Sequence, residues 1–462
     1  MSVAESDMQA PPAAAAETDA AAWPHPARAW WGVIVLMIGL TICFIDRNIL
    51  TLLVEPIKAD LRLTDTQMSL ILGAAFMIFY AIAAIPIARL ADTYSRRAVI
   101  GLSIAFWSLA TAAGGMASSF WQLFAARAAV GIGESAFAPA SYAILADSFP
   151  KEKLSRAIAT LHLGLSFGAG FALLFGAGVI AFFERISPIT LPLLGEVRAW
   201  QAVLVTVGLP GLIVAALMAT VQEPTRRGRI STADGSGARR AIPPKEIAGF
   251  LYKERRTFAP LFAANATATL ISAGVGAWVP TLFIRTYGWS MPQAAFAVGI
   301  VTLVTFPLGL FGGSLLSEFL RRRGCRDAEL RAALIGFAGL VPLSILFPLL
   351  NNPNVALSVL GLSMFMGALH SAPSAAAMQL ITPNEMRSQV RALLHVFVGV
   401  VGAGLGPIVV ALFTDYLFGG DSHLRFSMAL AVGLLGPFAI FCSWYVLRPY
   451  AESLERARTF AS

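Results

Sequence analysis

The chain has 462 residues, of which 57% are hydrophobic and only 13% are charged, and its formal net charge is +8. Because soluble domains carry about 25% charged residues, this composition excludes a water-soluble globular protein and indicates a protein of the lipid bilayer. Three cysteines without a C-x-x-C pair predict neither a disulfide framework nor a zinc site.

The first segment, residues 1–28, is rich in alanine and proline and has no apolar core. Such a composition is typical of disorder. We therefore expect a disordered cytoplasmic tail and no cleavable signal peptide. At the other end of the chain, residues 449–462 are expected to form a second, shorter cytoplasmic tail.

Twelve apolar segments lie between these tails, each long enough to cross a hydrocarbon core of about 30 Å as a helix. Six precede the main polar break and six follow it. The sequence therefore predicts an all-α membrane protein with two six-helix bundles, residues 29–221 and 257–448. The expected helices are 30–53, 67–90, 98–118, 121–148, 154–182, 200–221, 258–285, 292–320, 329–350, 354–381, 388–418 and 425–447.

Two of these helices contain charged residues near their middle. Asp46 is followed directly by Arg47 in the first helix, and Arg127 and Glu134 lie two turns apart on one face of the fourth. A charge at the bilayer centre costs about 3 kcal/mol or more. We therefore expect these four side chains to face the protein interior or water and to compensate one another.

These four charges admit two interpretations. One is a structural ion-pair network. The other is proton coupling or substrate anchoring, because a carboxylate with an apolar wall and a movable cationic partner changes its proton affinity with conformation. Arginine keeps its charge and suits a fixed partner or a clamp on phosphate or carboxylate. We predict the functional role for Asp46, Glu134, Arg47 and Arg127.

Other polar side chains within the expected helices are candidates for lining a substrate cavity. A histidine in a membrane helix must be bonded, so His162 and His370 are either satisfied packing residues or cavity residues. The same two interpretations apply to the remaining candidates, which are Tyr80, Tyr142, Asn265 and Trp278.

Glycines recur in the fifth and eleventh expected helices, where they permit the close sliding contacts that alternating access requires. The G-x-S-x-G pattern at 164–168 lies inside a hydrophobic helix, whereas a serine hydrolase needs it at a strand-to-helix turn. No H-E-x-x-H, P-loop or dinucleotide motif follows a strand. We therefore expect no enzyme.

The main polar break covers residues 222–256. It is rich in glycine, serine and arginine, continues with two prolines at 243–244, and ends in an amphipathic stretch at 245–256. We predict a cytoplasmic linker that ends in a surface helix. Such a linker either only joins the two bundles or also contacts lipid or regulates the protein.

The two halves carry a weak internal repeat. The pattern P-x-E-x-x-S occurs at 150–155 and again at 383–388, directly after the fourth and tenth expected helices. Two six-helix repeats with a binding site at their interface describe a secondary transporter.

The basic residues predict the orientation. With both termini in the cytoplasm, 26 of the 34 Lys and Arg residues lie in cytoplasmic segments and 6 lie outside. This bias obeys the positive-inside rule, so we expect a multi-pass protein of a bacterial inner (plasma) membrane. Because the charge is spread over seven segments, it is a topology signal, and nucleic-acid binding is not expected.

Residues 88–97, ARLADTYSRR, resemble the G-x-L-A-D-R-x-G-R-R loop signature of the major facilitator superfamily, although positions 88, 93 and 95 depart from it. The R-x-x-x-G-x-G sequence that starts at Arg127 is similar to the helix-four motif of that family, and 313–323 form a degenerate second copy of the loop. The resemblance implies the major facilitator fold, with two bundles around a central cavity. It also implies a cytoplasmic charge network that latches the outward-facing state, formed here by Asp92, Arg96 and Arg97.

Within that superfamily, the sequences FIDRN at 44–48, LVEPIKAD at 53–60 and GESA at 133–136 look like the spinster group. Spinster proteins carry lysophospholipids and sphingosine phosphate. The resemblance therefore implies an amphiphilic, anionic cargo. It also implies that Asp46 and Glu134 are proton-linked acids and that Arg47 and Arg127 are their partners.

Together these observations predict a proton-coupled secondary transporter for a lipid-like anion such as a lysophospholipid or sphingoid phosphate. One alternative is a proton-coupled carrier of small organic anions or drugs. Another is a non-transporting receptor or sensor, which would need a folded output domain that the polar break is too short to supply. We expect the lipid bilayer, protons and the cargo as partners, no metal or cofactor, and a monomer.

Overall fold

The computed structural model describes residues 23–186, 189–191, 195–225, 243–383 and 386–459. These residues contain twelve helical segments that are long and apolar enough to cross a membrane. The predicted all-α architecture with twelve membrane helices is thereby confirmed. Most of the predicted N-terminal tail and the centre of the predicted linker lie outside the described residues.

The first half contains six membrane spans, three of which are divided into shorter helical pieces. Its helices are α1 (Pro26–Leu52), α2 (Val54–Leu61), α3 (Asp65–Ser69), the π-helix η1 (Leu70–Ala74), α4 (Ala75–Thr93), α5 (Arg96–Gly114), α6 (Phe120–Glu134), α7 (Phe137–Ser148), α8 (Lys151–Ile186), α9 (Ala199–Gly208) and α10 (Pro210–Met218). A hairpin of β1 (Ile189–Leu191) and β2 (Gly195–Val197) follows α8. It was not predicted, because strands of three residues carry almost no periodic signal.

The second half repeats the six spans. Its helices are α11 (Pro244–Lys253), α12 (Arg255–Tyr287), α13 (Met291–Arg322), α14 (Ala328–Leu346), η2 (Phe347–Leu349), α15 (Pro353–Leu369), α16 (Ser371–Ile381), α17 (Arg387–Phe397), η3 (Val398–Gly404), α18 (Gly406–Leu412), η4 (Phe413–Leu417), η5 (Asp421–His423), α19 (Leu424–Tyr445) and α20 (Leu447–Thr459). Helix α11 lies where the sequence predicts a surface helix.

Several helices begin at a capping side chain. The Thr64 hydroxyl accepts the Gln67 backbone N–H at 3.1 Å, and the Gln67 side chain accepts the Thr64 N–H at 3.0 Å. The Ser95 hydroxyl accepts the Ala98 N–H at 3.2 Å at the start of α5. Such caps satisfy backbone N–H groups that have no partner in the first helical turn. The capping residues therefore fix where these helices begin.

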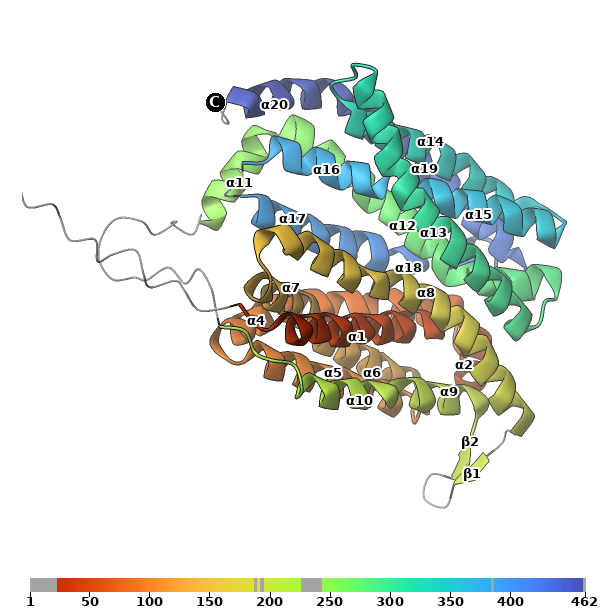
Figure 1. Cartoon of the computed structure of the whole chain (residues 1–462). Coiled ribbons are helices and arrows are strands. Elements are labelled where there is room, and N and C mark those ends of the chain that lie inside the picture. Colours follow the sequence, from red (N-terminus) through yellow and green to blue (C-terminus); the bar gives the residue numbers. More distant parts are fainter. Residues whose placement is uncertain (1–22, 187–188, 192–194, 226–242, 384–385, 460–462) are drawn as a thin grey trace, which may run out of the picture.

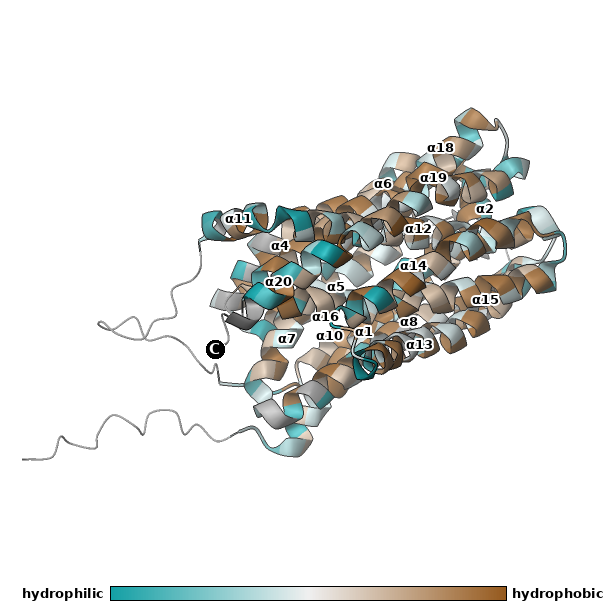
Figure 2. Cartoon of the chain, turned by 90° about the horizontal axis from the view of Figure 1, so that it is seen from above, coloured by the Kyte–Doolittle hydropathy of each residue, from teal (hydrophilic) through white to brown (hydrophobic). Residues whose placement is uncertain are grey.

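Figure 1 shows the helices running in one general direction, with α11 and α20 at one end and α2 and the hairpin at the other. We call these the linker end and the far end. In Figure 2, hydrophobic residues cover most of the long helices, whereas α11 and α20 are largely hydrophilic. A bilayer-spanning body with two polar helices at the linker end follows from this distribution.

The two halves meet along a seam where glycine permits close approach. The π-helices η1 and η3, one from each half, pack against each other there. A Cβ atom added to Gly73 would lie 2.5 Å from the Gly404 carbonyl oxygen. Helices α8 and α13 form a second contact, in which Gly170 receives the Leu303 side chain. Neither partner at these sites has room for a larger residue.

Candidate functional site

Four charged side chains from α1 and α6 form two ion pairs. Arg47 Nη2 lies 2.5 Å from Glu134 Oε2, and Arg47 Nε donates to the same oxygen at 2.7 Å. Arg127 Nη1 lies 3.7 Å from Asp46 Oδ1. We call these four residues the quartet. Each acid pairs with the arginine of the other helix, and the formal charges of the quartet cancel.

The quartet is buried with one exception. The side chains of Asp46, Glu134 and Arg127 are 3%, 0% and 5% exposed, whereas 29% of the Arg47 side chain is exposed. Burying charge is costly unless each polar atom has a partner. Arg47 is therefore the one member of the quartet that a ligand or solvent can reach.

Each buried carboxylate of the quartet is only half satisfied. The Thr111 hydroxyl on α5 donates to Asp46 Oδ2 at 2.8 Å, and the Cys43 thiol donates to Glu134 Oε2 at 3.0 Å. Within the described part of the chain, Asp46 Oδ1 and Glu134 Oε1 have no hydrogen-bond partner. Native proteins rarely leave buried polar atoms in this condition.

Aromatic rings hold both arginines. The Arg47 guanidinium lies 4.5 Å from the centre of the Phe76 ring and 5.7 Å from that of Tyr80. The Arg127 guanidinium lies 5.6 Å from the same Phe76 ring. The face of an aromatic ring attracts a cation. Phe76 therefore links the two ion pairs, and the candidate Tyr80 lies beside the exposed arginine.

Two further candidates, Tyr142 and His162, lie together. The Tyr142 hydroxyl and His162 Nε2 are 2.6 Å apart and hydrogen-bonded, and the two rings meet edge to face. Tyr142 lies on α7 and is 39% exposed. His162 lies on α8. This pair therefore presents polar atoms from two neighbouring helices of the first half.

The remaining three candidates are held in local packing. The Asn265 side chain donates to the Leu261 carbonyl one turn earlier at 2.8 Å. Trp278 is fully buried, and its indole donates to the Pro407 carbonyl at 3.1 Å. His370 is buried against Phe337, with ring centres 4.4 Å apart. The structure does not bring these three residues to the quartet.

At the linker end, the predicted gate residues hold the start of α5. Arg96 forms an ion pair with Asp147 on α7, and Arg97 donates to the Ala219 and Val221 carbonyls at 3.2 Å. Both partners belong to the first half. The side chain of the third predicted gate residue, Asp92, lies outside the described residues.

The carboxylate of Glu223 completes this arrangement. It accepts the backbone N–H groups of Arg96 and Arg97 at 3.0 Å and 2.9 Å and the Ser95 hydroxyl at 2.7 Å. A carboxylate at a helix N-terminus satisfies free donors and complements the helix dipole. The end of the sixth span is thereby tied to the start of the third.

At the far end, an ion-pair network joins the two halves. Arg285 at the end of α12 donates to Asp65 Oδ2 at 2.7 Å and to Asp65 Oδ1 at 2.9 Å, and it pairs with Glu55 at 2.7 Å. Lys58 pairs with the fully buried Asp65 and, at 2.9 Å, with Asp421 of the second half. We call these five residues the far-end network.

Every side-chain ion pair or hydrogen bond that joins the halves in the described part of the chain lies at this end. Besides the far-end network, Asp415 accepts the Thr66 N–H at 2.7 Å and its hydroxyl at 2.6 Å. Asp65, Asp415 and Asp421 converge closely enough to suggest a metal site. Their oxygens already receive Lys58, Arg285 and Thr66, so these acids are compensated without an ion.

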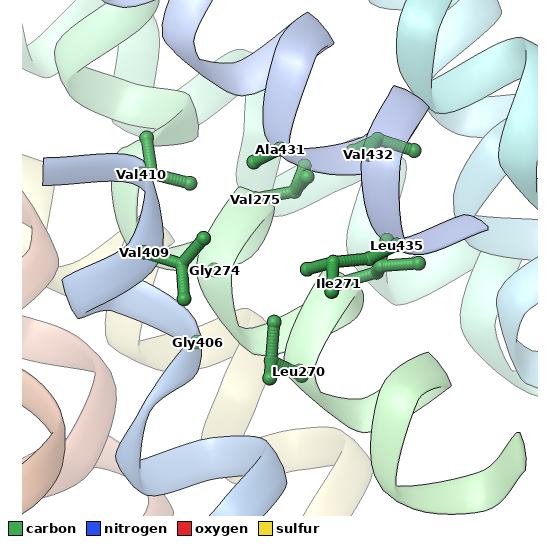
Figure 3. A pocket seen from close by; sticks show the side chains of 10 residues that line it. All are labelled: Leu270, Ile271, Gly274, Val275, Gly406, Val409, Val410, Ala431, Val432 and Leu435. Carbon is green, nitrogen blue, oxygen red and sulfur yellow. The ribbon is translucent and has the colours of Figure 1, made fainter. Parts of the chain in front are cut away.

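Figure 3 shows a small pocket between α12, α18 and α19. Its volume of about 10 Å³ holds no more than about one water molecule. Aliphatic side chains and two glycines line it, with no polar group to orient a ligand. The pocket is lined by Leu270, Ile271, Gly274, Val275, Gly406, Val409, Val410, Ala431, Val432 and Leu435. It is a gap in packing and offers no substrate site.

Sequence reasoning missed the partners that lie far along the chain. Thr111 and Phe76 contact the quartet but are unremarkable residues of apolar helices. Arg285 was counted only among the outer basic residues. Its position at the end of a span, near outer loops that carry several acids, is the signal that could have indicated an ion pair there.

Comparison with known proteins agrees with this architecture. The model of the Major Facilitator Superfamily matches residues 36–407. An MFS-type efflux pump of Mycolicibacterium smegmatis is 29% identical over 97% of this chain and 99% of its own length. Protein spinster of Drosophila melanogaster is 25% identical over 64% of this chain and 46% of its own length.

A solved structure has the same fold. The crystal structure of a bacterial homologue of the human lysosomal transporter spinster, in an inward-facing and unoccupied conformation, superposes with a TM-score of 0.73. The two chains are 24% identical, and the match covers 95% of this chain and 98% of the other. The resemblance to the spinster group predicted from sequence is thereby confirmed.

Proposed function

The chain belongs to the major facilitator superfamily, and from this premise we propose that it is a proton-coupled transporter of an amphiphilic anion. Transport proceeds by alternating access, in which the two six-helix halves rock about a central site. The observation that carries the proposal is the quartet. It is neutral and buried, it lacks hydrogen bonds to one oxygen of each acid, and it opens outward only through Arg47.

The coupling step follows from the charge of the quartet. A proton bound at Glu134 removes the negative charge that Arg47 faces at 2.5 Å. Arg47, the one partly exposed member, is then free to pair with an anionic cargo. When the cargo carries one negative charge, the empty, deprotonated site and the loaded, protonated site are both neutral, which avoids net charge in the bilayer. Proton and anion therefore cross together.

The amphiphilic cargo is supported by the faces beside the polar groups. On α8, His162 is followed by the exposed apolar Leu163 and Phe167. On α17, exposed Leu393 and Phe397 flank a polar stripe of the second half. A headgroup at the arginines and a hydrocarbon tail along these faces match a lysophospholipid or sphingoid phosphate, the cargo class that the spinster resemblance implies.

A second candidate is a carrier of small organic anions or drugs. The specific observation in its favour is the 29% identity to an efflux pump over nearly the whole chain. A small anion would need the arginines but not the apolar faces. The length of the hydrocarbon tail of the transported compound therefore separates the two candidates.

The remaining features belong to the same proposal. The protein lies in a bacterial inner membrane with the linker end in the cytoplasm, because most basic residues gather there. The halves are residues 29–221 and 257–448, joined by a linker at 222–256 with tails at 1–28 and 449–462. The protein works as a monomer, with lipid, protons and the anion as its partners.

The proposal is tested with Glu134→Gln, which resembles the protonated acid. Purified protein in proteoliposomes is given an imposed pH gradient and labelled 1-palmitoyl lysophosphatidate. We expect the unmodified protein to accumulate the lipid and Glu134→Gln to lose gradient-driven accumulation while keeping exchange at equal pH. The matched control is Glu318→Gln, an exposed acid on α13 paired with Arg322. Unaltered gradient dependence in Glu134→Gln would refute the coupling role.

A further inference from the structure

The two carboxylate oxygens of Glu134 have different surroundings. Oε2 receives three contacts, from Arg47 Nη2 at 2.5 Å, from Arg47 Nε at 2.7 Å and from the Cys43 thiol at 3.0 Å. Oε1 is buried and accepts no hydrogen bond from the described residues. Because every described donor points at Oε2, the two oxygens differ in how readily they can bind a proton.

The position of a bound proton follows from this asymmetry. The N–H and S–H groups that point at Oε2 donate hydrogen to its lone pairs, so a proton added to Oε2 would face their hydrogens. A proton on Oε1 meets no described donor, and Oε2 of the neutral acid can still accept hydrogen bonds. Oε1 is therefore the oxygen that is free to take the proton.

Cys43 and Arg47 act on Oε2 from the same helix. They lie one turn apart on α1, where side chains four residues apart share a face, and Cys43 is only 2% exposed. Glu134 ends α6, whose backbone is packed closely against α5, because a Cβ atom added to Gly133 would lie 2.9 Å from Trp107 Cβ. With the backbone held there, the direction of the Glu134 side chain depends on its donors.

The other charged and titratable groups near this acid lie in the quartet or beside it. Asp46 and Arg127 form the second ion pair, with 3.7 Å between Oδ1 and Nη1. Tyr80 on α4 lies beside Arg47, whose guanidinium is 5.7 Å from the centre of its ring. Among the described residues, Arg47 and Cys43 are the donors to the acid itself.

This arrangement gives the thiol a role when the cargo binds. In the proposed function Arg47 leaves the protonated Glu134 and pairs with the anion, and Cys43 is then the described donor that remains at Oε2. We propose that Cys43 is a positioning residue, which holds Oε2 of Glu134 in both states and so directs the proton to Oε1. This inference rests on the proposed function and adds the residue that orients its proton-binding acid.

The test follows the protonation of Glu134 by infrared difference spectroscopy on the purified full chain in lipid, over a series of pH values. The carbonyl stretch of the protonated acid is identified as the band that Glu134→Gln removes. A hydrogen bond to a carboxylate favours its charged form, so in Cys43→Ala this band should appear at higher pH. We expect its midpoint to rise by about half a pH unit, because a thiol is a weak donor. Cys43→Ser, which restores a donor, should return the midpoint toward that of the unmodified protein.

The matched control is Cys442→Ala, which removes the thiol of a buried cysteine in α19, outside the quartet. Its midpoint should equal that of the unmodified protein. A second readout uses the protein without substitution. The S–H stretch of Cys43, identified by its loss in Cys43→Ser, should move to higher frequency as Glu134 becomes protonated, because a neutral acid accepts a weaker hydrogen bond than a carboxylate.

The outcomes separate this inference from the proposed function. If Cys43→Ala leaves the midpoint unchanged, or if Cys43→Ser raises it as much as Cys43→Ala does, the positioning role is overturned and the proposed function stands. An S–H stretch that does not respond to the protonation of Glu134 overturns the role as well. If no carbonyl band depends on Glu134 at any pH, the acid does not take up protons, and the proposed coupling is overturned together with this inference.

Discussion

At the residue scale, the two buried acids of the quartet are only partly hydrogen-bonded. Asp46 and Glu134 each pair with an arginine, yet one oxygen of each has no hydrogen-bond partner among the described residues. Native proteins rarely leave buried polar atoms in this condition. Thr111 is the one hydrogen-bond donor to Asp46 Oδ2 among the described residues, so it holds this carboxylate in place.

Thr111→Val tests the contribution of this hydrogen bond, because valine keeps the shape of threonine and loses the hydroxyl. The buried Asp46 carboxylate would then have no hydrogen bond, and such a loss costs about 1–3 kcal/mol. We expect lower stability by that amount in denaturant titrations in micelles. Thr281→Val is the control, since Thr281 is buried but forms no side-chain hydrogen bond in the described structure. Equal stabilities of the two variants would contradict the assignment.

At the element scale, several membrane spans are broken into shorter helices. The fourth span is interrupted directly after Glu134, between α6 and α7, and the tenth is interrupted at His370, between α15 and α16. The π-helices η1 and η3 face each other across the seam. Local π-turns are frequent at functional sites and allow the helix rotation that rocking halves need.

Gly73→Ala tests the seam between η1 and η3. The added Cβ would lie 2.5 Å from the Gly404 carbonyl oxygen, a backbone atom that cannot turn aside. We expect the halves to be forced apart at this point, with transport reduced at least about tenfold in proteoliposomes and a lower thermal midpoint. Gly276→Ala is the control, because nothing lies within 4 Å of a Cβ at that position. A fully active Gly73→Ala protein would show that the seam opens without this contact.

At the scale of the whole molecule, the two ends differ in how they join the halves. The far-end network and the Thr66–Asp415 contact connect them, whereas the described charge contacts of Arg96 and Arg97 at the linker end stay within the first half. The structure is therefore locked by charges at the far end. Alternating access requires this network to break when the far end opens.

Arg285→Gln tests the lock, because it removes the bidentate contact to the buried Asp65 and the pair with Glu55. We expect a shift toward conformations open at the far end. Spin labels at cysteines placed at Arg62 and Ser422, which lie in opposite halves, would show longer distances; Cys325 is replaced by serine first. Arg198→Gln is the control, since Arg198 pairs with Asp60 inside the first half. Identical distance distributions in both variants would rule out a lock.

Much of the fold could be predicted from sequence, because each membrane span carries its own signal. An apolar stretch of about 20 residues indicates by its composition alone that it crosses lipid, so all twelve spans could be predicted. The π-helices η1 and η3 and the break at His370 could not. These irregularities arise from contacts with other helices. The candidate site was predictable where a residue is improbable in lipid, as for Asp46 and Glu134. It was not predictable for Trp278 and Asn265, because the sequence does not distinguish a polar side chain buried in helix packing from one that lines a cavity.

By itself the sequence determined that this chain has twelve apolar helices in two sets of six and that four charges lie inside them. Only the tertiary structure decided which charges pair, that Phe76 and Thr111 support them, and that Arg285 and Lys58 join the halves at one end. The physical reason is the distance along the chain over which each property is determined. Hydropathy is a property of each residue and its neighbours along the chain, whereas an ion pair depends on how helices far apart in sequence pack, and spacing along the chain does not contain that information.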